Sequence, residues 1–436
     1  MKVVIITYGC QMNVHDSEVI KKSLKDMGLE ISDDVEGADI IILNTCCVRE
    51  SAEKRIYGRI NYLKKQKYNK PQLIIGMIGC LAQKDKGTVF KKAPHVDFAL
   101  GPQEIDRIPE MIRKTLMGQK MIGEFGEHEF IGEIDQVLPD NQWAGWLSIM
   151  KGCDNYCSYC IVPYVRGHEK SKKYSLVEQE FRYLESIGVK DVTLLGQNVN
   201  SYGKGLQEKI DFADLLTRLD RLDLIHRIRF MTSHPKDLSE KVIYAIAQGK
   251  NLCEHVHLPF QAGSDRILES MNRKYRIDDY LEKVSLIKSE IKGCALTTDI
   301  IVGFPGETED DFQKTLDVVR NVGFDSVHTF IYSIRSGTRA AEFGDQVPED
   351  VKKERIARLI DIQNSISLEK NRALEGQVFD VLFDNVDKNG KRLQGRTRSN
   401  KIVVTDMNRD LLGREVKVRI LEGLHWTLVG EVLHDD

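Results

Sequence analysis

The chain has 436 residues, of which 41% are hydrophobic and 30% charged, a composition that excludes a collagen-like, low-complexity or mostly disordered protein. At about 150 residues per domain, the length predicts two or three domains. The formal charge of −3 excludes a surface that is basic throughout, and the longest apolar runs are too short to span a membrane. Nine cysteines and no N-terminal signal pattern predict a cytoplasmic protein that uses cysteines for metal or redox chemistry rather than for disulfides.

Residues 1–120 repeat a strand-then-helix pattern that is typical of an open parallel α/β sheet domain. Short runs rich in β-branched residues predict buried parallel strands at 3–8, 40–44, 73–78 and 96–100. Helical patterns lie at 17–27, 48–65 and 82–92. Residues 121–140 contain six acidic residues and no Lys or Arg, and we expect them to form an acidic linker.

A second strand-and-helix rhythm fills residues 141–375. Strands are predicted at 146–151, 191–195, 227–232, 255–259, 296–303 and 326–332. Helical stretches such as 175–187 and 277–291 lie between them, and 351–375 reads as one long charged helix. Six such units are too few for a complete eight-fold barrel, so we expect a partial (βα)6 barrel.

Residues 376–436 switch to short alternating segments separated by turn residues. The predicted strands are 378–383, 401–405, 415–420 and 428–433. The fold class is therefore α/β, with a small all-β barrel at the C-terminus.

Cys153, Cys157 and Cys160 form the most specific chemical signal, because three thiolates within eight residues can converge on one metal centre. A structural zinc site would need a fourth ligand, and His168 is the nearest candidate. Three cysteines at this spacing instead leave one iron of a four-iron cluster without a protein ligand. We therefore expect an iron–sulfur cluster with one open iron.

A second cysteine trio is spread along the N-terminal domain. Cys10, Cys46 and Cys80 each follow the carboxyl end of one predicted strand. These ends share one edge of a parallel sheet, where such sheets bind ligands, so the three thiols are expected to hold a second cluster. Cys47 is adjacent to Cys46, and only geometry separates the two as ligands. Cys253 and Cys294 have no partners in this pattern and are interpreted as structural.

Several strings of the sequence resemble a known family. They are Thr7-Tyr-Gly-Cys-Gln-Met-Asn13, Asn44-Thr-Cys-Cys-Val-Arg-Glu50, Gly152 to Gly167 with its three cysteines, and Leu194-Leu-Gly-Gln-Asn-Val-Asn200. The chain resembles the radical S-adenosylmethionine (radical SAM) methylthiotransferases, most closely the MiaB-type tRNA-2-methylthio-N6-dimethylallyladenosine synthases. The resemblance covers essentially the whole chain and includes a TRAM-like RNA-binding module at 376–436, which rests on Leu393-Gln-Gly-Arg-Thr397.

The resemblance implies a transferase that converts N6-isopentenyladenosine beside the tRNA anticodon to its 2-methylthio derivative. It implies two 4Fe–4S clusters and two molecules of S-adenosylmethionine per turnover. One S-adenosylmethionine methylates a sulfur at the auxiliary cluster, and the other yields a 5′-deoxyadenosyl radical that opens adenine carbon 2. No catalytic side chain is expected beyond the clusters, since the cofactors carry the difficult steps.

Polar residues at the ends of the predicted barrel strands are candidate cofactor contacts, because such contacts collect there. The candidates are Tyr159, Gly196, Gln197, Asn198, Ser233, Gln261 and Asp299. For Asn198 and Gln261, a role in binding loop backbone is equally open. His234 precedes a proline in a turn and is expected to be structural, and residues 304–308 read as a loop and helix N-cap.

Two basic segments are candidate RNA contacts. Residues 49–70 hold eight Lys or Arg against two acids, with tyrosines interleaved, and residues 388–401 hold six basic residues and no acid. The candidate RNA-binding residues are Arg49, Arg55, Arg59, Lys391, Arg392, Arg396 and Arg398. Either run alone is more typical of a solvated surface. The resemblance makes a tRNA anticodon stem-loop the expected partner.

Two alternatives stay open at this point. The same chemistry could act on a ribosomal-protein aspartate or on threonylcarbamoyl-adenosine in tRNA, as in sister branches. The chain could also be a non-catalytic iron–sulfur RNA-binding protein. For the enzyme, the resemblance implies a low-potential electron donor such as flavodoxin or ferredoxin.

Overall fold

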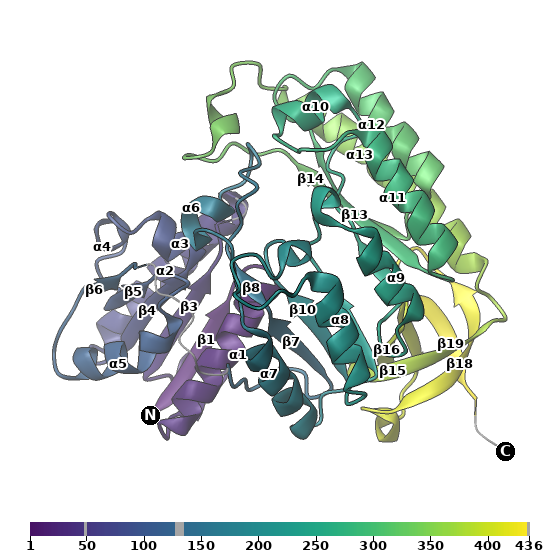
Figure 1. The fold of residues 1–436 in the computed structure, drawn as a ribbon. Helices are drawn as coiled ribbons and strands as arrows, with labels where there is room; N and C mark the ends of the chain where they lie inside the picture. The colour runs from purple at the N-terminus through teal and green to yellow at the C-terminus, as the bar shows by residue number, and fades with distance from the viewer. Residues whose placement is uncertain (48–49, 127–134, 434–436) are drawn as a thin grey trace. The chain divides into compact units, whose positions relative to one another are not determined.

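The computed structural model describes residues 1–47, 50–126 and 135–433, and the chain divides into two compact units (Figure 1). The first unit comprises Met1–Asp140, Trp146–Asp154 and Cys160–Tyr183. The second unit comprises Asn141–Gly145, Asn155–Tyr159 and Leu184–Asp436. Strand β7 (Ala144–Ser148) belongs to both units.

A six-stranded parallel sheet in the order β2-β1-β3-β4-β5-β6 forms the centre of the first unit. The strands are β1 (Lys2–Thr7), β2 (Glu30–Ile31), β3 (Ile40–Thr45), β4 (Ile74–Gly79), β5 (Phe98–Leu100) and β6 (Ile122–Glu124). The four expected strands are present. The edge strands β2 and β6 were not expected, since two or three residues are too short for a periodic signal. Strand β6 lies in the range expected to be a linker.

Helices cover both faces of this sheet. Ile41, Leu43 and Ile75 pack in one apolar cluster with α2, α3 and α4, whereas Ile40 and Ile42 pack in another with α1 and α5. The helices are α1 (Gln11–Asp26), α2 (Glu50–Asn69), α3 (Cys80–Lys84), α4 (Val89–Lys92), the short η1 (Ile105–Arg107) and α5 (Ile108–Leu116). Burial on both faces explains why β3 and β4 are continuous apolar runs rather than alternating ones.

The remainder of the first unit contains two short paired strands with one helix between them and one after them. Its elements are β8 (Met150–Lys151), α6 (Val162–Arg166), β9 (Lys170–Ser171) and α7 (Tyr174–Ser186). Strands β8 and β9 pair in antiparallel fashion. The Lys172 ammonium is buried and donates to Asp135 at 2.8 Å and to Glu180 at 2.7 Å, so this segment is held by a desolvated ion pair network.

The second unit begins with the strands of the partial barrel. Strands β10 (Asp191–Leu195) and β11 (Arg227–Phe230) are parallel neighbours, and β12 (His255–His257), β13 (Ala295–Val302) and β14 (Ser326–Ile331) form a parallel sheet. All coincide with predicted strands, and the predicted fold class is confirmed. The helices between them are η2 (Val199–Ser201), α8 (Phe212–Arg221), η3 (Pro235–Asp237), α9 (Glu240–Gln248), α10 (Asp265–Ser270), α11 (Ile277–Glu290), α12 (Glu309–Val322) and η4 (Arg339–Glu342).

Helix α12 illustrates how the sequence sets these boundaries. Thr308 and Asp311 form a reciprocal capping box, which confirms the predicted N-cap, and the helix ends at Gly323, whose φ is +63°. A left-handed residue at this position favours glycine, because other side chains are strained there.

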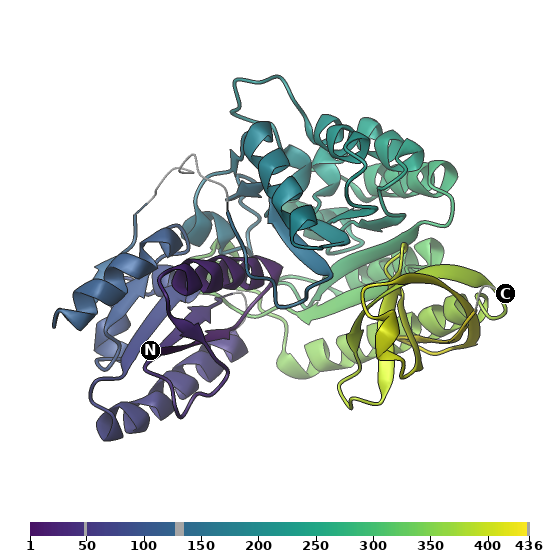
Figure 2. The ribbon, with the colours of Figure 1, turned by 90° about the horizontal axis from the view of Figure 1, so that it is seen from below.

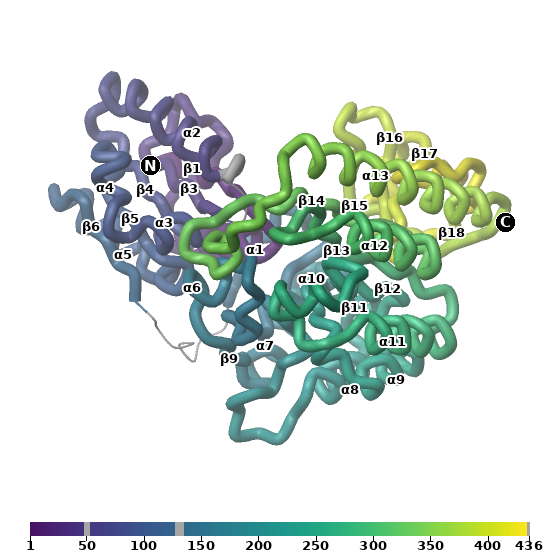
Figure 3. Tube along the Cα trace, turned by 90° about the horizontal axis from the view of Figure 1, so that it is seen from above, coloured from purple at the N-terminus to yellow at the C-terminus, as the bar shows by residue number. Residues whose placement is uncertain are grey.

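The long helix α13 (Glu349–Arg372) leads into the C-terminal barrel (Figure 3). Five strands close this barrel in the order β15-β16-β17-β19-β18, drawn in yellow in Figure 2. The strands are β15 (Val378–Val386), β16 (Arg392–Thr397), β17 (Ile402–Asp406), β18 (Glu415–Gly423) and β19 (Leu428–Val432), with the short η5 (Arg409–Leu411). Strand β16 was not predicted.

Buried arginines join the C-terminal barrel to the partial barrel. The Arg227 side chain, 1% exposed, donates to Glu415 at 2.7 Å and to the Asp380 carbonyl at 3.0 Å. Arg229 donates to Asp191 at 2.9 Å and to the Thr397 carbonyl at 2.8 Å. Buried charges of this kind need several partners in fixed positions, so the two barrels dock in one defined orientation. Within the described part of the chain, no helix combines the length and apolar character needed to cross a membrane.

Candidate functional site

The first cysteine trio lies at the carboxyl edge of the N-terminal sheet. Cys10 precedes α1, Cys46 follows β3, and Cys80 begins α3 directly after β4. In the order β2-β1-β3-β4, the chain passes from β1 to β2 in one direction and from β3 to β4 in the other, so the strand order reverses between β1 and β3. Helices α1 and α2 accordingly cover opposite faces of the sheet. In open α/β sheets, this reversal opens the crevice in which ligands bind.

Two glycines let the cysteine loops approach one another. Gly9 has a φ of +131°, and a Cβ added there would lie 2.7 Å from the Cβ of Cys46. Gly79 has a φ of +91°, and its added Cβ would lie 2.5 Å from the Thr45 carbonyl oxygen. No other residue fits at either position, so the backbone before Cys10 packs on Cys46, and the backbone before Cys80 packs on the residue before Cys46.

Asn13 and Asn44, which belong to the first two strings quoted from the sequence, connect the loops of Cys10 and Cys46. The Asn13 amide donates to Asn44 Oδ1 at 2.9 Å and to the Thr45 carbonyl at 3.2 Å, and Asn44 donates back to the Asn13 carbonyl at 2.8 Å. These side chains are fully buried, so their hydrogen bonds hold the loops of Cys10 and Cys46 in a fixed relation. Sequence reasoning recognised both strings but not this role.

Arg166 brings a buried positive charge to this trio. Its guanidinium, 5% exposed, forms a 3.0 Å ion pair with Asp16 and a hydrogen bond to the Cys80 thiol. The hydrogen bond between the thiols of Cys47 and Cys80, together with Arg166, lowers the pKa of Cys80 to about 6. A thiolate is therefore accessible at neutral pH, as a metal ligand requires.

Cys47 differs from Cys46 in its surroundings. Its thiol is bonded to that of Cys80 and lies in the apolar cluster beneath the sheet, and both effects raise its pKa. The Cβ of Cys46 instead faces the loop of Cys10. Cys10 is the exposed member of the trio, which leaves the edge open to solvent.

The second trio lies in one short segment that crosses the two units. Cys153 and Cys160 belong to the first unit and Cys157 to the second. The guanidinium of Arg273, 7% exposed, donates to the Sγ of Cys157 at 3.5 Å and to the Pro259 carbonyl at 2.9 Å.

The segment around Cys157 is fixed by hydrogen bonds to the loop after α10. Asn272 donates to the Tyr156 carbonyl at 2.8 Å, and Ser158 donates to the Ser270 carbonyl at 2.8 Å. Tyr156 and Asn272 both have positive φ values, +49° and +56°, so the backbone is strained where it presents the cysteine.

Both trios fit an anionic iron–sulfur cluster. Thiolates are its ligands, and hydrogen bonds to sulfur are a recurrent means of tuning it. Each trio has one buried arginine at a thiol, Arg166 at Cys80 and Arg273 at Cys157. Arg166 lies within the string Gly152 to Gly167, but each arginine is distant along the chain from the cysteine that it contacts, so neither contact has a local sequence signal. The His168 imidazole, considered as a zinc ligand, contacts the Asp154 carboxylate at 2.7 Å.

Unpaired buried polar atoms mark the ends of β10 and β11. Among the described residues, the Asn198 Oδ1, Asn200 Nδ2 and Ser233 Oγ atoms have no hydrogen-bond partner. Leaving a buried polar group unpaired costs about 1–3 kcal/mol, so such a group in a native protein indicates a missing ligand or water. A polar cofactor such as S-adenosylmethionine fits these atoms; Asn198 and Ser233 were predicted and Asn200 was not.

Backbone strain lies at the same strand ends. Thr232, after β11, has a φ of +68°, and Gln261, after β12, has a φ of +69°. A β-branched residue is an outlier in this region, and such strain concentrates at functional sites. The Gln261 amide donates to the Asp299 carbonyl at 3.0 Å, and the Asp299 carboxylate lies 3.4 Å from His257 Nε2.

The other candidate cofactor contacts are Gly196, Gln197 and Tyr159. Gly196 and Gln197 form the turn after β10, and Tyr159 packs against the apolar cluster that includes Ala262. His234 accepts a hydrogen bond from the Lys236 amide, and burial lowers its pKa to about 2, so it stays neutral. This agrees with the structural role expected for His234.

The candidate RNA contacts fall into two groups. Arg49 lies outside the described residues. On α2, Arg55 is exposed and Arg59 stacks 5.1 Å from the ring centre of Tyr62. On the β-barrel, Lys391 and Arg392 are exposed.

Arg396 and Arg398 have partners within the chain. The Arg398 guanidinium pairs with Glu254 at 2.8 Å and donates to the Leu252 carbonyl at 2.6 Å, so it takes part in docking the two barrels. Arg396 is half-buried and donates to Asn400 at 3.1 Å.

Comparison with known proteins agrees with this arrangement. Residues 2–101 match a family described as Uncharacterized protein family UPF0004, residues 147–319 the Radical SAM superfamily, and residues 372–433 the TRAM domain. The chain is 48% identical over 432 residues to a tRNA-2-methylthio-N(6)-dimethylallyladenosine synthase of Carboxydothermus hydrogenoformans, covering 98% of each chain. It is 48% identical over 440 residues to the protein of that name from Alkaliphilus oremlandii, covering 100% of this chain and 93% of the other.

A solved structure shares the fold at low identity. The radical S-adenosylmethionine methyltransferase TsrM of Kitasatospora setae aligns with a TM-score of 0.58 and 12% identity, covering 78% of this chain and 75% of that one. The radical SAM superfamily implies S-adenosylmethionine and a 4Fe–4S cluster. The identities over nearly the whole length confirm the resemblance found in the sequence: the chain belongs to the family of tRNA-2-methylthio-N(6)-dimethylallyladenosine synthases.

Proposed function

We propose that this protein is a radical SAM methylthiotransferase that converts N6-isopentenyladenosine beside the tRNA anticodon to its 2-methylthio derivative. The 48% identity to curated synthases over the whole chain supports this assignment. The main structural support is that the loops of Cys10, Cys46 and Cys80 contact one another where the strand order of the N-terminal sheet reverses. A radical SAM enzyme that only cleaves its cofactor has no use for a second trio of this kind.

Two clusters and two molecules of S-adenosylmethionine per turnover are part of the proposal. Cys153, Cys157 and Cys160 would hold the first cluster, and Cys10, Cys46 and Cys80 the auxiliary one. When bound, these groups supply methyl transfer to sulfur and a radical able to open the unactivated bond at adenine carbon 2. The protein contributes the positions of the groups and the exclusion of water.

The residues of the chain have distinct parts in this scheme. Arg166 and Arg273 place a positive charge at a thiol of each trio, which stabilises the anionic ligand in a buried site. Asn198 and Ser233 offer unpaired oxygens to a polar cofactor at the barrel strand ends. The remaining proposed cofactor contacts are Tyr159, Gly196, Gln197, Gln261 and Asp299.

The RNA partner is proposed to be the anticodon stem-loop. We assign the auxiliary site to residues 1–120, an acidic connection to 121–140, the radical SAM domain to 141–375 and the RNA-binding module to 376–436. Arg55, Arg59, Lys391 and Arg392 are the proposed phosphate contacts that face solvent at least in part, with Arg49, Arg396 and Arg398 completing the set. A flavodoxin or ferredoxin would deliver the electrons, and tRNA as substrate places the reaction in the cytoplasm.

Mass spectrometry of tRNA nucleosides tests the substrate. A deletion strain should lose 2-methylthio-N6-isopentenyladenosine and accumulate N6-isopentenyladenosine, and the wild-type gene should restore the product. A strain with the Cys10→Ala, Cys46→Ala and Cys80→Ala substitutions should not recover it. Unchanged levels of this nucleoside would contradict the proposal. Loss of methylthio-threonylcarbamoyl-adenosine or of a methylthiolated ribosomal protein would instead assign a sister substrate.

A further inference from the structure

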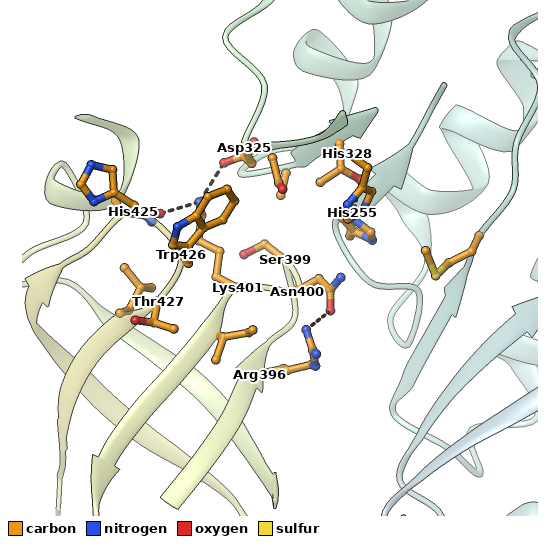
Figure 4. A pocket seen from close by; sticks show the side chains of 17 residues that line it. His255, Asp325, His328, Arg396, Ser399, Asn400, Lys401, His425, Trp426 and Thr427 are labelled. Carbon is orange, nitrogen blue, oxygen red and sulfur yellow. Dashed lines mark hydrogen bonds and ion pairs between the residues drawn. The ribbon is translucent and has the colours of Figure 1, made fainter. Parts of the chain in front are cut away.

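A cavity of about 320 Å³ lies between the partial barrel and the C-terminal β-barrel, both of which belong to the second unit. The strands β12, β13 and β14 form one wall, with His255, Thr297 and His328. The β16–β17 turn and the β18–β19 turn form the other, and Figure 4 shows Trp426 and His328 on opposite sides of the space. This volume is at the lower end of the range for small-molecule sites, so it suits one mononucleotide and excludes a double helix.

Trp426 supplies an aromatic surface in this cavity. It lies in the tight turn between β18 and β19, where the Leu424 amide donates to the Thr427 carbonyl at 2.9 Å. The Trp426 side chain is 61% exposed although it lines the cavity, so its packing contributes little to the β-barrel core. An exposed tryptophan at the rim of a cavity is suited to stacking on a nucleic acid base.

Arg396 supplies a positive charge to the cavity. Its guanidinium lines the cavity and donates to Asn400 at 3.1 Å, and it forms no ion pair among the described residues. Burial lowers its pKa and outweighs the opposite effect of Asp384 and Asp191, which form no ion pair with it.

Lys401 shows the contrast with Arg396. It also lines the cavity, but its ammonium pairs with Asp325 at 2.9 Å and donates to Asn371 at 2.9 Å (Figure 4). Of these two cations, Arg396 is the one that remains available to an anionic ligand.

We propose that this cavity holds one unpaired nucleotide of the RNA substrate, with its base stacked on Trp426 and a phosphate paired with Arg396. The inference rests on the proposed RNA substrate and adds a second point of contact, distinct from the modified adenosine. Ser399, Asn400 and the imidazole of His255, whose pKa is well below its usual value, present neutral donors and acceptors to the base edge. Arg227 and Arg229 fix the orientation of the two barrels, and with it the positions of both cavity walls, so the site is preorganised.

Binding of RNA to the anaerobically purified full chain tests this proposal. The probes are a fluorescent anticodon stem-loop hairpin, a fully paired duplex of similar length, and adenosine monophosphate as competitor. Trp426→Ala should weaken hairpin binding by about 5- to 100-fold, the range expected for loss of one stacked base. Arg396→Gln should weaken binding and lower the slope of log affinity against log salt by about 0.7, the effect of one phosphate contact on a single strand.

Matched controls lie on the same β-barrel. Leu421→Ala removes a 53%-exposed apolar side chain that does not line the cavity, and Arg419→Gln removes an exposed arginine paired with Glu431 at 2.9 Å. Both should bind the hairpin as the wild type does. Trp426→Ala should also form 5′-deoxyadenosine at the wild-type rate without RNA, which separates a binding defect from a damaged radical site.

Wild-type affinity in Trp426→Ala would overturn the inference and leave the proposed function intact. The wild type could bind adenosine monophosphate as tightly as it binds the hairpin, and Trp426→Ala could lose this binding. That result would overturn the RNA assignment in favour of a free nucleotide. A wild-type chain that binds the hairpin no better than the duplex would contradict the proposed RNA substrate itself. If Arg396→Gln does not fold, the comparison of Trp426→Ala with Leu421→Ala still decides, because both side chains are largely exposed.

Discussion

Replacing Arg166 by Met should open the auxiliary site locally. The side chains of Arg166 and Asp16 are 5% and 1% exposed, and the substitution leaves the Asp16 carboxylate buried without its cation. Burial, the largest single effect, would raise the pKa of Asp16, but Arg166 together with His15 and Lys151 outweighs it and the net pKa is lowered. The pair therefore stabilises the fold at neutral pH and loses this effect as the pH falls. Breaking such a buried pair costs about 3–5 kcal/mol.

Hydrogen exchange measured by mass spectrometry is the suitable assay, because it reports local opening in a chain of more than one domain. Amides of α1 and α6 should lose about two to four orders of magnitude of protection in Arg166→Met. Arg182→Met removes an arginine whose pair with Glu178, at 2.7 Å, is 50% and 27% exposed, and it should change protection by less than about tenfold. Asp16→Asn combined with Arg166→Met should recover part of the loss. Equal effects of Arg166→Met and Arg182→Met would refute the reasoning.

Three further predictions follow from the same structure. Burial raises the pKa of Glu18 to about 7, so the free energy of unfolding should fall as the pH rises from about 4.5 to 7. Glu18→Gln should flatten this dependence in urea titrations, and an unchanged pH profile would contradict the raised pKa of Glu18. Arg273→Met removes the donor to Cys157 and should shift the cluster potential to more negative values by roughly 60–120 mV in an EPR-monitored titration, whereas a positive shift would exclude an electrostatic role. Gly79→Ala forces a Cβ to 2.5 Å from the Thr45 carbonyl at a φ of +91°, so it should lower the melting temperature and the iron content together. A normal iron content would contradict the claim that close packing of the Cys46 and Cys80 loops is needed to hold a cluster.

The strands of the N-terminal sheet and of the partial barrel could be predicted, because buried parallel strands appear in the sequence as continuous apolar runs. Strand β16 could not, since only Leu393, Gly395 and Thr397 face the barrel interior, while Arg392, Gln394 and Arg396 between them gave the appearance of a basic surface segment. The helix expected at 82–92 is two short helices, α3 and α4, separated by a turn at 85–88.

The cysteine positions could be predicted because they follow strand ends, and the topology brings strand ends to one edge. The residues that tune them could not. Arg166 reaches Cys80, and Arg273 reaches Cys157, through contacts between segments far apart in sequence. Arg398 shows the same limit: its guanidinium pairs with Glu254 across the docked barrels, and nothing in the basic run indicates this partner. Charge is visible in a sequence, whereas the partner of a charge is set by tertiary packing.

Iron and acid-labile sulfide analysis of the anaerobically reconstituted protein tests the central claim most directly. The wild type should hold two four-iron clusters, or about eight irons per chain. Triple Ala variants of Cys10, Cys46 and Cys80, or of Cys153, Cys157 and Cys160, should each retain one cluster, and only the first of them should still form 5′-deoxyadenosine from S-adenosylmethionine. A wild type with about four irons, or with zinc alone, would contradict the account.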